Sequence, residues 1–196
     1  MSKLYENIEC LEYEIIELEP HQIGDNLYNN IKENLKKKLE KKCNHLGYII
    51  EIFKINEYKT LEIKPSSFSG NCPFKVLYSC RICRPQKGQI ITGKIINISG
   101  MIAAKNGPID MIIQSENINK NKFIINNNII YYIDKNKKKV EINKNELLKI
   151  KVLDIHMLKN DDKIFVIGYL EDITEEEDKK QFFDDIYYKQ DKEEFI

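Results

Sequence analysis

Hydrophobic and polar residues alternate at residues 11–18 (LEYEIIEL), and this period of two predicts a strand. Beyond Pro20, apolar residues recur every four positions up to Cys43. This spacing predicts a helix from about Asp25, a good N-cap, to Cys43, with Gly47 as its C-cap glycine. Because four residues exceed one helical turn by about 40°, the apolar stripe winds around the helix and suits a helix that crosses a sheet obliquely.

Three more strands are expected in the first half of the chain, at Tyr48–Ile55, Thr60–Lys64 and Phe74–Arg84. The stretch between the last two, residues 65–73, is rich in Pro, Ser, Gly and Asn and predicts a loop that carries one aromatic residue, Phe68. The order of a strand, a helix and three strands predicts an α+β layer in which one helix packs on an antiparallel sheet.

A polar hinge that contains Pro85 and Gly88 marks a boundary after this layer. Short apolar stretches follow, separated by glycines or by turns rich in Asn and Asp, and this rhythm predicts a small antiparallel barrel or sandwich. The Asn-rich residues 117–128 are expected to form a loop insertion. The expected strands are Gln89–Ser99, Met101–Lys105, Asp110–Gln114, Lys122–Ile133, Glu146–His156 and Lys163–Leu170.

Charges balance over the whole chain, at 31 basic and 31 acidic residues, but not along it. Residues 1–19 hold one base and six acids, net −5, and residues 171–196 hold four bases and eleven acids, net −7. Residues 20–170 hold the remaining 26 bases and 14 acids, net +12. A uniformly basic nucleic-acid coat and a disordered acidic protein are therefore excluded. The basic middle meets an anionic partner, is screened from non-specific contacts by the acidic tail, or serves solubility alone.

The sequence thus predicts an N-terminal domain at residues 1–85, a barrel at residues 86–172 and an acidic tail at residues 173–196. The tail has apolar residues at helical spacing, so it is expected to be either a flexible tail or a short helix that docks on a partner. No apolar run approaches the roughly 18 residues that a membrane span requires, and the first residues lack the apolar stretch of a secretory signal. Membrane and secreted proteins are therefore not expected.

Five cysteines, an odd number in a chain expected inside cells, argue against a disulfide framework. Cys80 and Cys83 have zinc-knuckle spacing, and Cys43 and His45 could complete a tetrahedral site. In a strand, however, residues three apart point to opposite faces, so buried thiols are favoured over zinc. The sequence has no glycine-rich phosphate loop and no nucleophile motif, so no catalytic residue, metal or cofactor is expected.

Four segments in unbroken order resemble the seventh-subunit (stalk) family of DNA-directed RNA polymerases. This family comprises the polymerase II stalk subunit and its counterparts in polymerases I and III and in the archaeal polymerase. The resemblance spans residues 11–172 and is carried by the pieces GYII, FKV.Y, RP.KG, GP and IF.IG.L. It implies an α+β tip domain, RNP-like, followed by an all-β oligonucleotide-binding (OB) barrel. The segments are residues 18–52, 73–95, 99–113 and 160–172.

The resemblance also implies a non-catalytic subunit that binds a fourth-subunit-like stalk partner. Such a subunit docks on the polymerase core near the clamp, beside the largest subunit and a small subunit, and supports transcription initiation. By position, the residues implied in core docking are Pro65, Phe68, Gly70, Gly47 and Tyr48. Those implied between the domains or toward the partner are Arg84, Pro85, Lys87, Gly88, Gly107 and Pro108.

Contact with the nascent RNA is a further implication of the resemblance. No aromatic residue lies between Tyr78 and Phe123, so the first barrel strands offer no platform for stacking bases. Residues 85–170 hold 14 bases and 8 acids, so RNA contact is expected to be weak, electrostatic and sensitive to salt. The candidate residues are Lys94, Lys105, Lys122, Tyr131 and Lys151. The aromatic residues that remain for stacking are Phe123, Tyr131, Tyr132, Phe165 and Tyr169.

Two other functions compete with this interpretation. A free-standing RNA-binding barrel protein is the first alternative, and an enzyme or zinc-redox protein built on Cys80 and Cys83 is the second. The abundance of Lys, Ile and Asn, at 29, 34 and 20 residues, indicates an AT-rich coding sequence and favours a large DNA virus over an AT-rich protist. The protein is expected inside cells with its polymerase, in the cytoplasmic viral factory and the virion if viral, or in the nucleus if cellular.

Overall fold

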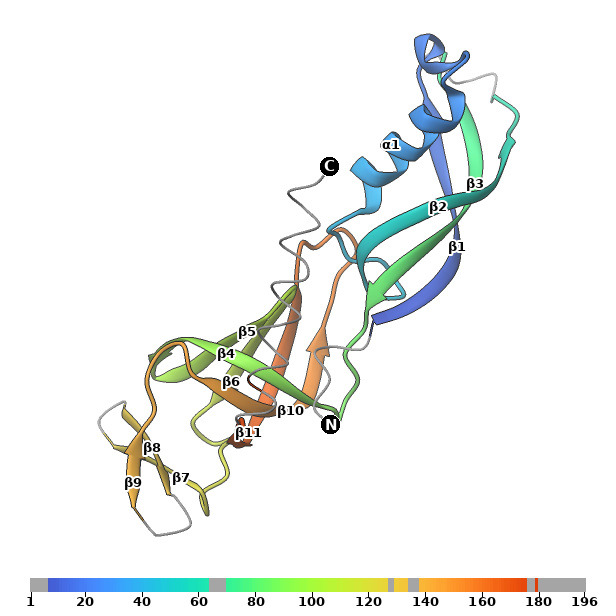
Figure 1. Cartoon of the computed structure of the whole chain (residues 1–196). Coiled ribbons are helices and arrows are strands. Elements are labelled where there is room, and N and C mark those ends of the chain that lie inside the picture. The colour runs from blue at the N-terminus through green and yellow to red at the C-terminus, as the bar shows by residue number, and fades with distance from the viewer. Residues whose placement is uncertain (1–6, 64–69, 127–128, 134–137, 176–178, 180–196) are drawn as a thin grey trace. The chain divides into compact units, whose positions relative to one another are not determined.

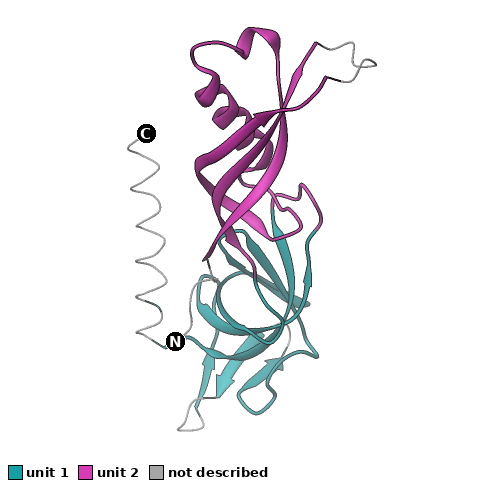
Figure 2. Ribbon diagram, turned by 90° about the vertical axis from the view of Figure 1, so that its right-hand side faces the viewer, with its two compact units in different colours: residues 1–6, 85–157, 163–196 teal, residues 7–84, 158–162 magenta. Residues whose placement is uncertain are grey.

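The computed structural model describes residues 7–63, 70–126, 129–133, 138–175 and 179 (Figure 1). They fold as two compact units (Figure 2). The N-terminal unit comprises residues 7–84 and 158–162, and the barrel unit comprises residues 85–157 and the described residues from 163 onward. Most of the predicted acidic tail lies outside the described residues. Within the described part of the chain, no helix is long and apolar enough to cross a membrane.

The N-terminal unit is a three-stranded antiparallel sheet with one helix on it (Figure 1). The strands β1 (Asn7–Leu18), β2 (Tyr48–Thr60) and β3 (Cys72–Cys83) lie in the order β1-β3-β2. The helix α1 (Leu27–Leu39) follows a short 3-10 helix, η1 (Pro20–Gln22). This arrangement confirms the predicted α+β layer. The core between helix and sheet is formed by Ile16, Leu18, Ile31, Leu35, Leu39, Ile49, Ile52, Ile55, Phe74, Val76, Tyr78, Cys80 and Ile82.

The helix is shorter than predicted, and Gly47 is not its cap. Helix α1 ends at Leu39, and the chain then turns through Lys41, whose φ of 61° lies in the left-handed region. Cys43 continues the apolar spacing of the helix but lies beyond it, in an isolated bridge to the first residue of β2. Cys43 fits the apolar pattern because it is buried, at 2% exposure, and not because it belongs to the helix.

One continuous strand, β2, replaces the two strands predicted at Tyr48–Ile55 and Thr60–Lys64. Its pairing with β3 shifts by one residue at three places, and a β-bulge adds one residue at each such shift. Ile49, Ile52 and Ile55 are therefore all buried although they are three residues apart. The sequence pattern does not predict this strand, because a regular strand buries every second residue and the buried residues here are three apart.

Five strands of the barrel unit form a closed barrel, in the order β10-β11-β6-β5-β4. Their bounds are Ile90–Ser99 for β4, Met101–Asn106 for β5, Ile109–Gln114 for β6, Leu147–His156 for β10 and Ile164–Ile173 for β11. Neighbouring strands are antiparallel except β6 and β11, which are parallel. The closed barrel confirms the predicted OB-type fold. Its interior residues include Ile91, Ile95, Met111, Ile150 and Val166, each at most 1% exposed.

The chain between β6 and β10 forms a separate three-stranded sheet. Its strands β7 (Phe123–Asn126), β8 (Ile129–Ile133) and β9 (Lys139–Glu141) lie in the order β7-β8-β9. The single strand predicted at Lys122–Ile133 is therefore wrong, because a hairpin lies there. Strand β7 also lies within the Asn-rich segment that was expected to be a loop. Apolar packing explains the difference, since Phe123 is buried and its ring lies 5.5 Å from that of Tyr132.

Candidate docking and nucleic-acid surfaces

The outer face of the N-terminal sheet, opposite α1, carries exposed apolar side chains. Leu11, Tyr13 and Ile15 alternate along β1 and are 60%, 52% and 49% exposed. The alternate residues Ile16 and Leu18 point to the other face, where they are buried in the core shared with α1. A single exposed apolar residue is ordinary on a protein surface, but three in succession on one strand form a patch.

Strands β3 and β2 extend this patch with further apolar groups and with cations at its margin. Leu77 of β3 pairs directly with Tyr13. The ammonium of Lys75 lies 4.4 Å from the centre of the Tyr13 ring, and the guanidinium of Arg81 lies 4.9 Å from that of Phe53. These contacts show that the side chains share one face of the sheet. We call this surface the open sheet face, and it consists of Leu11, Tyr13, Ile15, Phe53 and Leu77.

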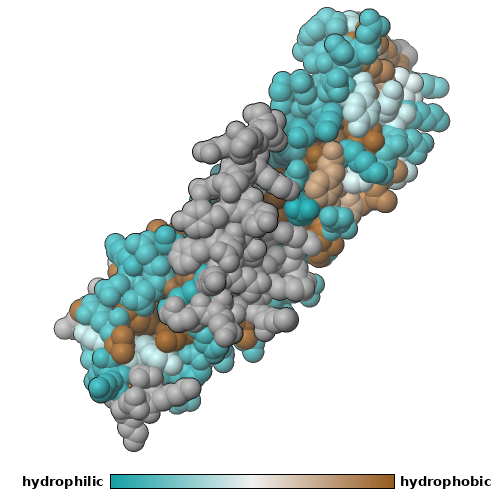
Figure 3. Space-filling model, in the orientation of Figure 1, coloured by the Kyte–Doolittle hydropathy of each residue, from teal (hydrophilic) through white to brown (hydrophobic). Residues whose placement is uncertain are grey.

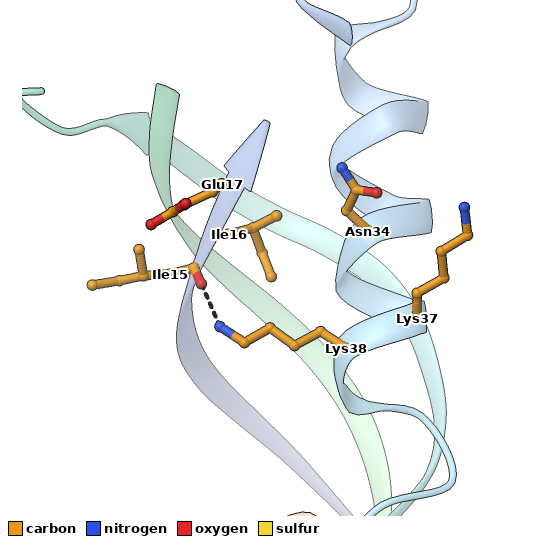
Figure 4. A pocket seen from close by; sticks show the side chains of 6 residues that line it. All are labelled: Ile15, Ile16, Glu17, Asn34, Lys37 and Lys38. Atoms are coloured by element: carbon orange, nitrogen blue, oxygen red, sulfur yellow. Dashed lines mark hydrogen bonds between the residues drawn. The ribbon is translucent and has the colours of Figure 1, made fainter. Parts of the chain in front are cut away.

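A cavity of about 570 Å³ lies between β1 and α1 (Figure 4). Lys38 extends from the helix toward the strand, where its ammonium donates to the carbonyl oxygen of Ile15 at 2.7 Å and to the Glu14 carboxylate at 2.8 Å. The Glu14 carboxylate also accepts a hydrogen bond from the Ile15 amide at 3.2 Å. Side chains therefore satisfy both backbone groups of Ile15, which protects this part of the sheet edge from pairing with another strand.

Gly47 and Tyr48, two of the implied docking residues, lie where β2 begins. A Cβ atom on Gly47 would lie 2.6 Å from the carbonyl oxygen of Cys83, a distance that no side chain tolerates without a shift of the backbone. The Asn44 side chain accepts a hydrogen bond from the Gly47 amide at 3.0 Å and fixes the turn. Tyr48 is partly buried and pairs with Cys83 in the sheet. Gly47 therefore has a structural role at the junction of β2 and β3.

The loop implied in core docking is described only at its ends, because Pro65 and Phe68 lie outside the described residues. The amide of Leu61 donates to the carbonyl oxygen of Pro73 at 2.8 Å and closes the base of the loop. Gly70 is exposed and has a φ of 69°, in the left-handed region that favours glycine. The described ends of the loop are therefore held together next to β2 and β3.

The implied hinge residues pass from one unit to the other in sequence. Arg84, the last residue of its segment in the N-terminal unit, is exposed, whereas Pro85 is buried. Lys87 forms an ion pair of 2.6 Å with Asp154 of β10, and this hydrogen bond lowers the pKa of the Asp154 carboxyl. The amide of Gly88 donates to a β10 carbonyl at 2.8 Å. The hinge is thus attached to the barrel by contacts with one strand.

Gly107 and Pro108 form the turn between β5 and β6. Gly107 has a φ of 56°, which favours glycine. The carbonyl oxygen of Pro108 accepts a hydrogen bond of 2.9 Å from the amide of Ile164, at the start of β11. This turn therefore helps to place β11 beside β6.

Lysine side chains are arranged along the outer surface of β10, β4 and β5. Lys94 of β4 pairs directly with Lys105 of β5. Lys149 and Lys151 alternate with buried residues along β10, which pairs with β4. Like charges on paired strands repel, and a phosphate anion between them would reduce this repulsion. We call Lys94, Lys105, Lys149 and Lys151 the basic row. Lys149 was not predicted from the sequence. It could have been found, because residues two apart on a strand point to the same face and Lys149 is two residues from Lys151.

Two of the RNA-binding candidates lie apart from the basic row. Lys122 donates to the carboxylate of Asp172, and this hydrogen bond raises the pKa of the Lys122 ammonium. Its charge is thus already offset by a carboxylate. Tyr131 lies on β8, in the separate sheet. Of the five candidates, the structure therefore pairs Lys94 with Lys105, places Lys151 on the neighbouring strand opposite Ile90, and places Lys122 and Tyr131 elsewhere.

Phe165 is the most exposed of the five aromatic residues considered for stacking. It is 42% exposed on β11, whereas Phe123 is 3% exposed. Ile167 on the same strand and Ile112, its partner on β6, are 43% and 38% exposed. On the face that Figure 3 presents, hydrophobic residues are interspersed with hydrophilic ones. An aromatic ring for base stacking is therefore available at β11.

Cys80 and Cys83 are both buried, in β3. The sulfur of Cys80 lies 3.3 Å from that of Cys10. Cys43 is also buried, and burial together with nearby aspartates raises its pKa to about 11. Among the residues that the structure describes, no three His, Cys, Asp or Glu side chains are grouped so that they could hold a metal ion.

Comparison with known proteins gives two matches. The family model described as "SHS2 domain found in N terminus of Rpb7p/Rpc25p/MJ0397" matches residues 14–70, a segment of the N-terminal unit that holds α1 and β2. A protein of Acanthamoeba polyphaga mimivirus, named "Putative DNA-directed RNA polymerase subunit L376", is 32% identical over 172 residues. The match covers 87% of this chain and 84% of the relative. This relative is viral, in agreement with the origin expected from the composition.

Proposed function

Because the chain belongs to the Rpb7-type family of DNA-directed RNA polymerase subunits, we propose that it is a non-catalytic stalk subunit of a multisubunit polymerase. The N-terminal unit docks on the polymerase core near the clamp and binds a fourth-subunit-like partner. The barrel unit contacts the emerging transcript. In this role the protein supports transcription initiation by binding, and it carries out no reaction of its own.

The open sheet face is the observation that carries the docking proposal. Leu11, Tyr13 and Ile15 keep about half of their surface exposed. Full burial of one large apolar side chain stabilises by about 1.5–3 kcal/mol, so covering the exposed half of three would contribute roughly 2–4 kcal/mol. Lys75 at the margin suits a partner surface that places a carboxylate beside an apolar centre.

The loop at residues 65–69 is proposed as a second contact with the core. Support comes from the family resemblance and from the hydrogen bond between Leu61 and Pro73, which joins the described ends of the loop. Phe68 would supply the apolar anchor. Aromatic anchors are typical of the few residues that dominate the energy of an interface.

Nascent RNA is proposed to contact the basic row. Lys94, Lys105 and Lys151 provide charge without base-specific readout, so affinity should depend steeply on salt and little on sequence. Phe165 offers one ring for stacking on a neighbouring part of the barrel unit. This contact would bind the transcript without a preference for its sequence.

The protein is proposed to accompany the polymerase in the infected cell, in the viral factory and in the virion. This proposal rests on the viral relative and on the role of a subunit that works only in its assembly. Mass spectrometry of purified virions, which would detect the chain beside the largest polymerase subunits, tests it directly.

The docking proposal is tested by purification of the full, tagged chain from cells that express the polymerase. The wild-type chain should bring the large polymerase subunits and a smaller stalk partner. Leu11→Asp should reduce their recovery at least tenfold, because an apolar interface does not accommodate an unpaired carboxylate. The matched control is Ile96→Asp, which changes a residue that is 52% exposed on β4 and should keep full recovery.

Three outcomes would contradict the proposal. The chain could be recovered without polymerase subunits, both variants could be recovered like wild type, or both could fail equally. The first result, together with RNA in the eluate, would favour a free-standing RNA-binding barrel protein, for which the basic row is the supporting observation.

A further inference from the structure

We propose that Cys10 and Cys80 form a site of oxidative modification, at which a hydroperoxide converts the two thiols into a disulfide that joins β1 to β3. The two residues are direct partners in the register of the antiparallel pair. Their sulfur atoms are 3.3 Å apart, within contact distance. This inference concerns the N-terminal unit alone and does not depend on the proposed function.

The backbone already has the geometry that a disulfide needs. Directly paired residues of antiparallel strands have Cα atoms about 4.5–5.5 Å apart, which lies within the range of about 4.4–6.8 Å found for disulfides. A disulfide bond is about 2.05 Å long, so the sulfurs must approach each other by a little over 1 Å. Rotation of the Cys10 side chain can supply this movement, because Cys10 is only partly buried.

The two thiols differ in access, which sets the order of the steps. Cys10 is partly exposed and Cys80 is fully buried. The thiolate of Cys10 attacks the outer oxygen of the hydroperoxide, the O–O bond breaks, and Cys10 becomes a sulfenic acid while the hydroperoxide is reduced to an alcohol or water. The sulfur of Cys80 then attacks the sulfenic sulfur, and the hydroxyl leaves as water together with the thiol proton.

The local environment keeps Cys80 protonated until that second step. Burial, the hydrogen bond with Cys10 and the carboxylate of Glu12 all raise the pKa of the Cys80 thiol. Cys80 therefore reacts poorly with an oxidant from solution, even if one could reach it. Its capture of the sulfenic acid depends instead on proximity, because the two sulfurs are 3.3 Å apart and the reaction takes place within one chain. A second oxidation of Cys10 is thereby prevented, since the sulfenic acid is consumed by its neighbour.

The disulfide would fix an edge strand to the centre of the sheet. Strand β1 lies at the edge of the order β1-β3-β2 and carries Leu11, Tyr13 and Ile15 of the open sheet face. The bond would close a loop of about 70 residues, and the restriction of so long a loop in the unfolded chain should raise the melting temperature by on the order of 10 °C. Oxidation would thus make the N-terminal unit more rigid without changing its outer face.

The experiment treats the full, reduced chain with hydrogen peroxide, alkylates the remaining thiols and digests the product with trypsin. Cleavage places Cys10 on the peptide of residues 4–32 and Cys80 on that of residues 76–81, separate from Cys83. A cross-linked pair of these peptides, a fall from five free thiols to three, and reversal by dithiothreitol are expected. The melting temperature of the oxidised chain should rise and then return on reduction.

Two variants complete the test. Cys10→Ser should abolish both the cross-link and the rise in melting temperature. Cys72→Ser, which removes another partly buried thiol of β3, should keep both. The proposal is overturned if Cys10 is recovered as a sulfinic or sulfonic acid, if Cys10 or Cys80 joins a different cysteine, or if both remain free for alkylation.

Discussion

Replacement of Gly47 by alanine tests whether this residue is needed for the fold of the N-terminal unit. The added Cβ would lie 2.6 Å from the carbonyl oxygen of Cys83 and 3.3 Å from its carbonyl carbon. Both contacts are with backbone, which cannot rotate away as a flexible side chain can. The start of β2 must therefore move away from β3, and the free energy of unfolding should fall by about 1–3 kcal/mol, the usual cost of overpacking.

Thermal unfolding followed by circular dichroism measures this loss. For a chain of this size a change of 1 kcal/mol shifts the melting temperature by about 2–4 °C, so Gly47→Ala should melt roughly 2–12 °C below wild type. Gly24→Ala is the matched control, because a Cβ at that position meets no atom within 4 Å, and its melting temperature should be unchanged. A Gly47→Ala protein that melts with the wild type would refute the steric argument and would leave docking as the reason for this glycine.

Three further predictions concern the core, the buried thiols and the basic row. Leu35→Ala should lower the free energy of unfolding by about 2–5 kcal/mol in urea denaturation, because Leu35 is fully buried. The pKa of Cys43 is raised from 9.0 to about 11, so the unfolded chain loses this proton first. The contribution of the Cys43 thiol to the free energy of unfolding should therefore be fully present below pH 9 and be lost as the pH rises toward 11. In Cys43→Ala the free energy of unfolding should fall less steeply over this pH range. Lys94→Gln and Lys105→Gln should each weaken RNA binding and reduce its salt slope by about 1, whereas Lys122→Gln should change little because Asp172 already pairs with that lysine.

The order and type of the elements could be predicted from the sequence where one period dominates. The alternation in β1 and the recurrence of apolar residues in α1 led to the correct elements. The strongly apolar β3 was found for the same reason. The predicted end of the helix was wrong, because Cys43 contributes an apolar position through contact with β2, and a periodicity argument counts any buried residue as part of the helix.

Long-range pairing was not available from the sequence. The parallel pairing of β6 with β11 joins residues more than 50 positions apart, and only the closed barrel specifies it. The hairpin of β7 and β8 was missed because a run of asparagines separates its two strands in the sequence and is typical of a loop.

The candidate site was predicted in part. Lys94 and Lys105 were selected separately, and only the register of β4 and β5 shows that they are paired. The ion pair of Lys122 with Asp172 depends on a fold that brings residues 50 positions apart together. The open sheet face was hidden for another reason, since Leu11, Tyr13 and Ile15 are the apolar positions that an alternating strand is expected to bury, and only the structure shows that they are exposed.

The two outer strands of the N-terminal sheet differ in how regularly they pair with β3. This difference determines where the chain can gain or lose a residue. Strand β1 matches β3 without interruption over twelve residues, so the loss or gain of one residue there would exchange every inward and outward side chain beyond it. Strand β2 already contains three one-residue shifts, and removal of one residue at such a place would restore regular pairing. Natural insertions and deletions among relatives should therefore collect in β2 and be absent from β1.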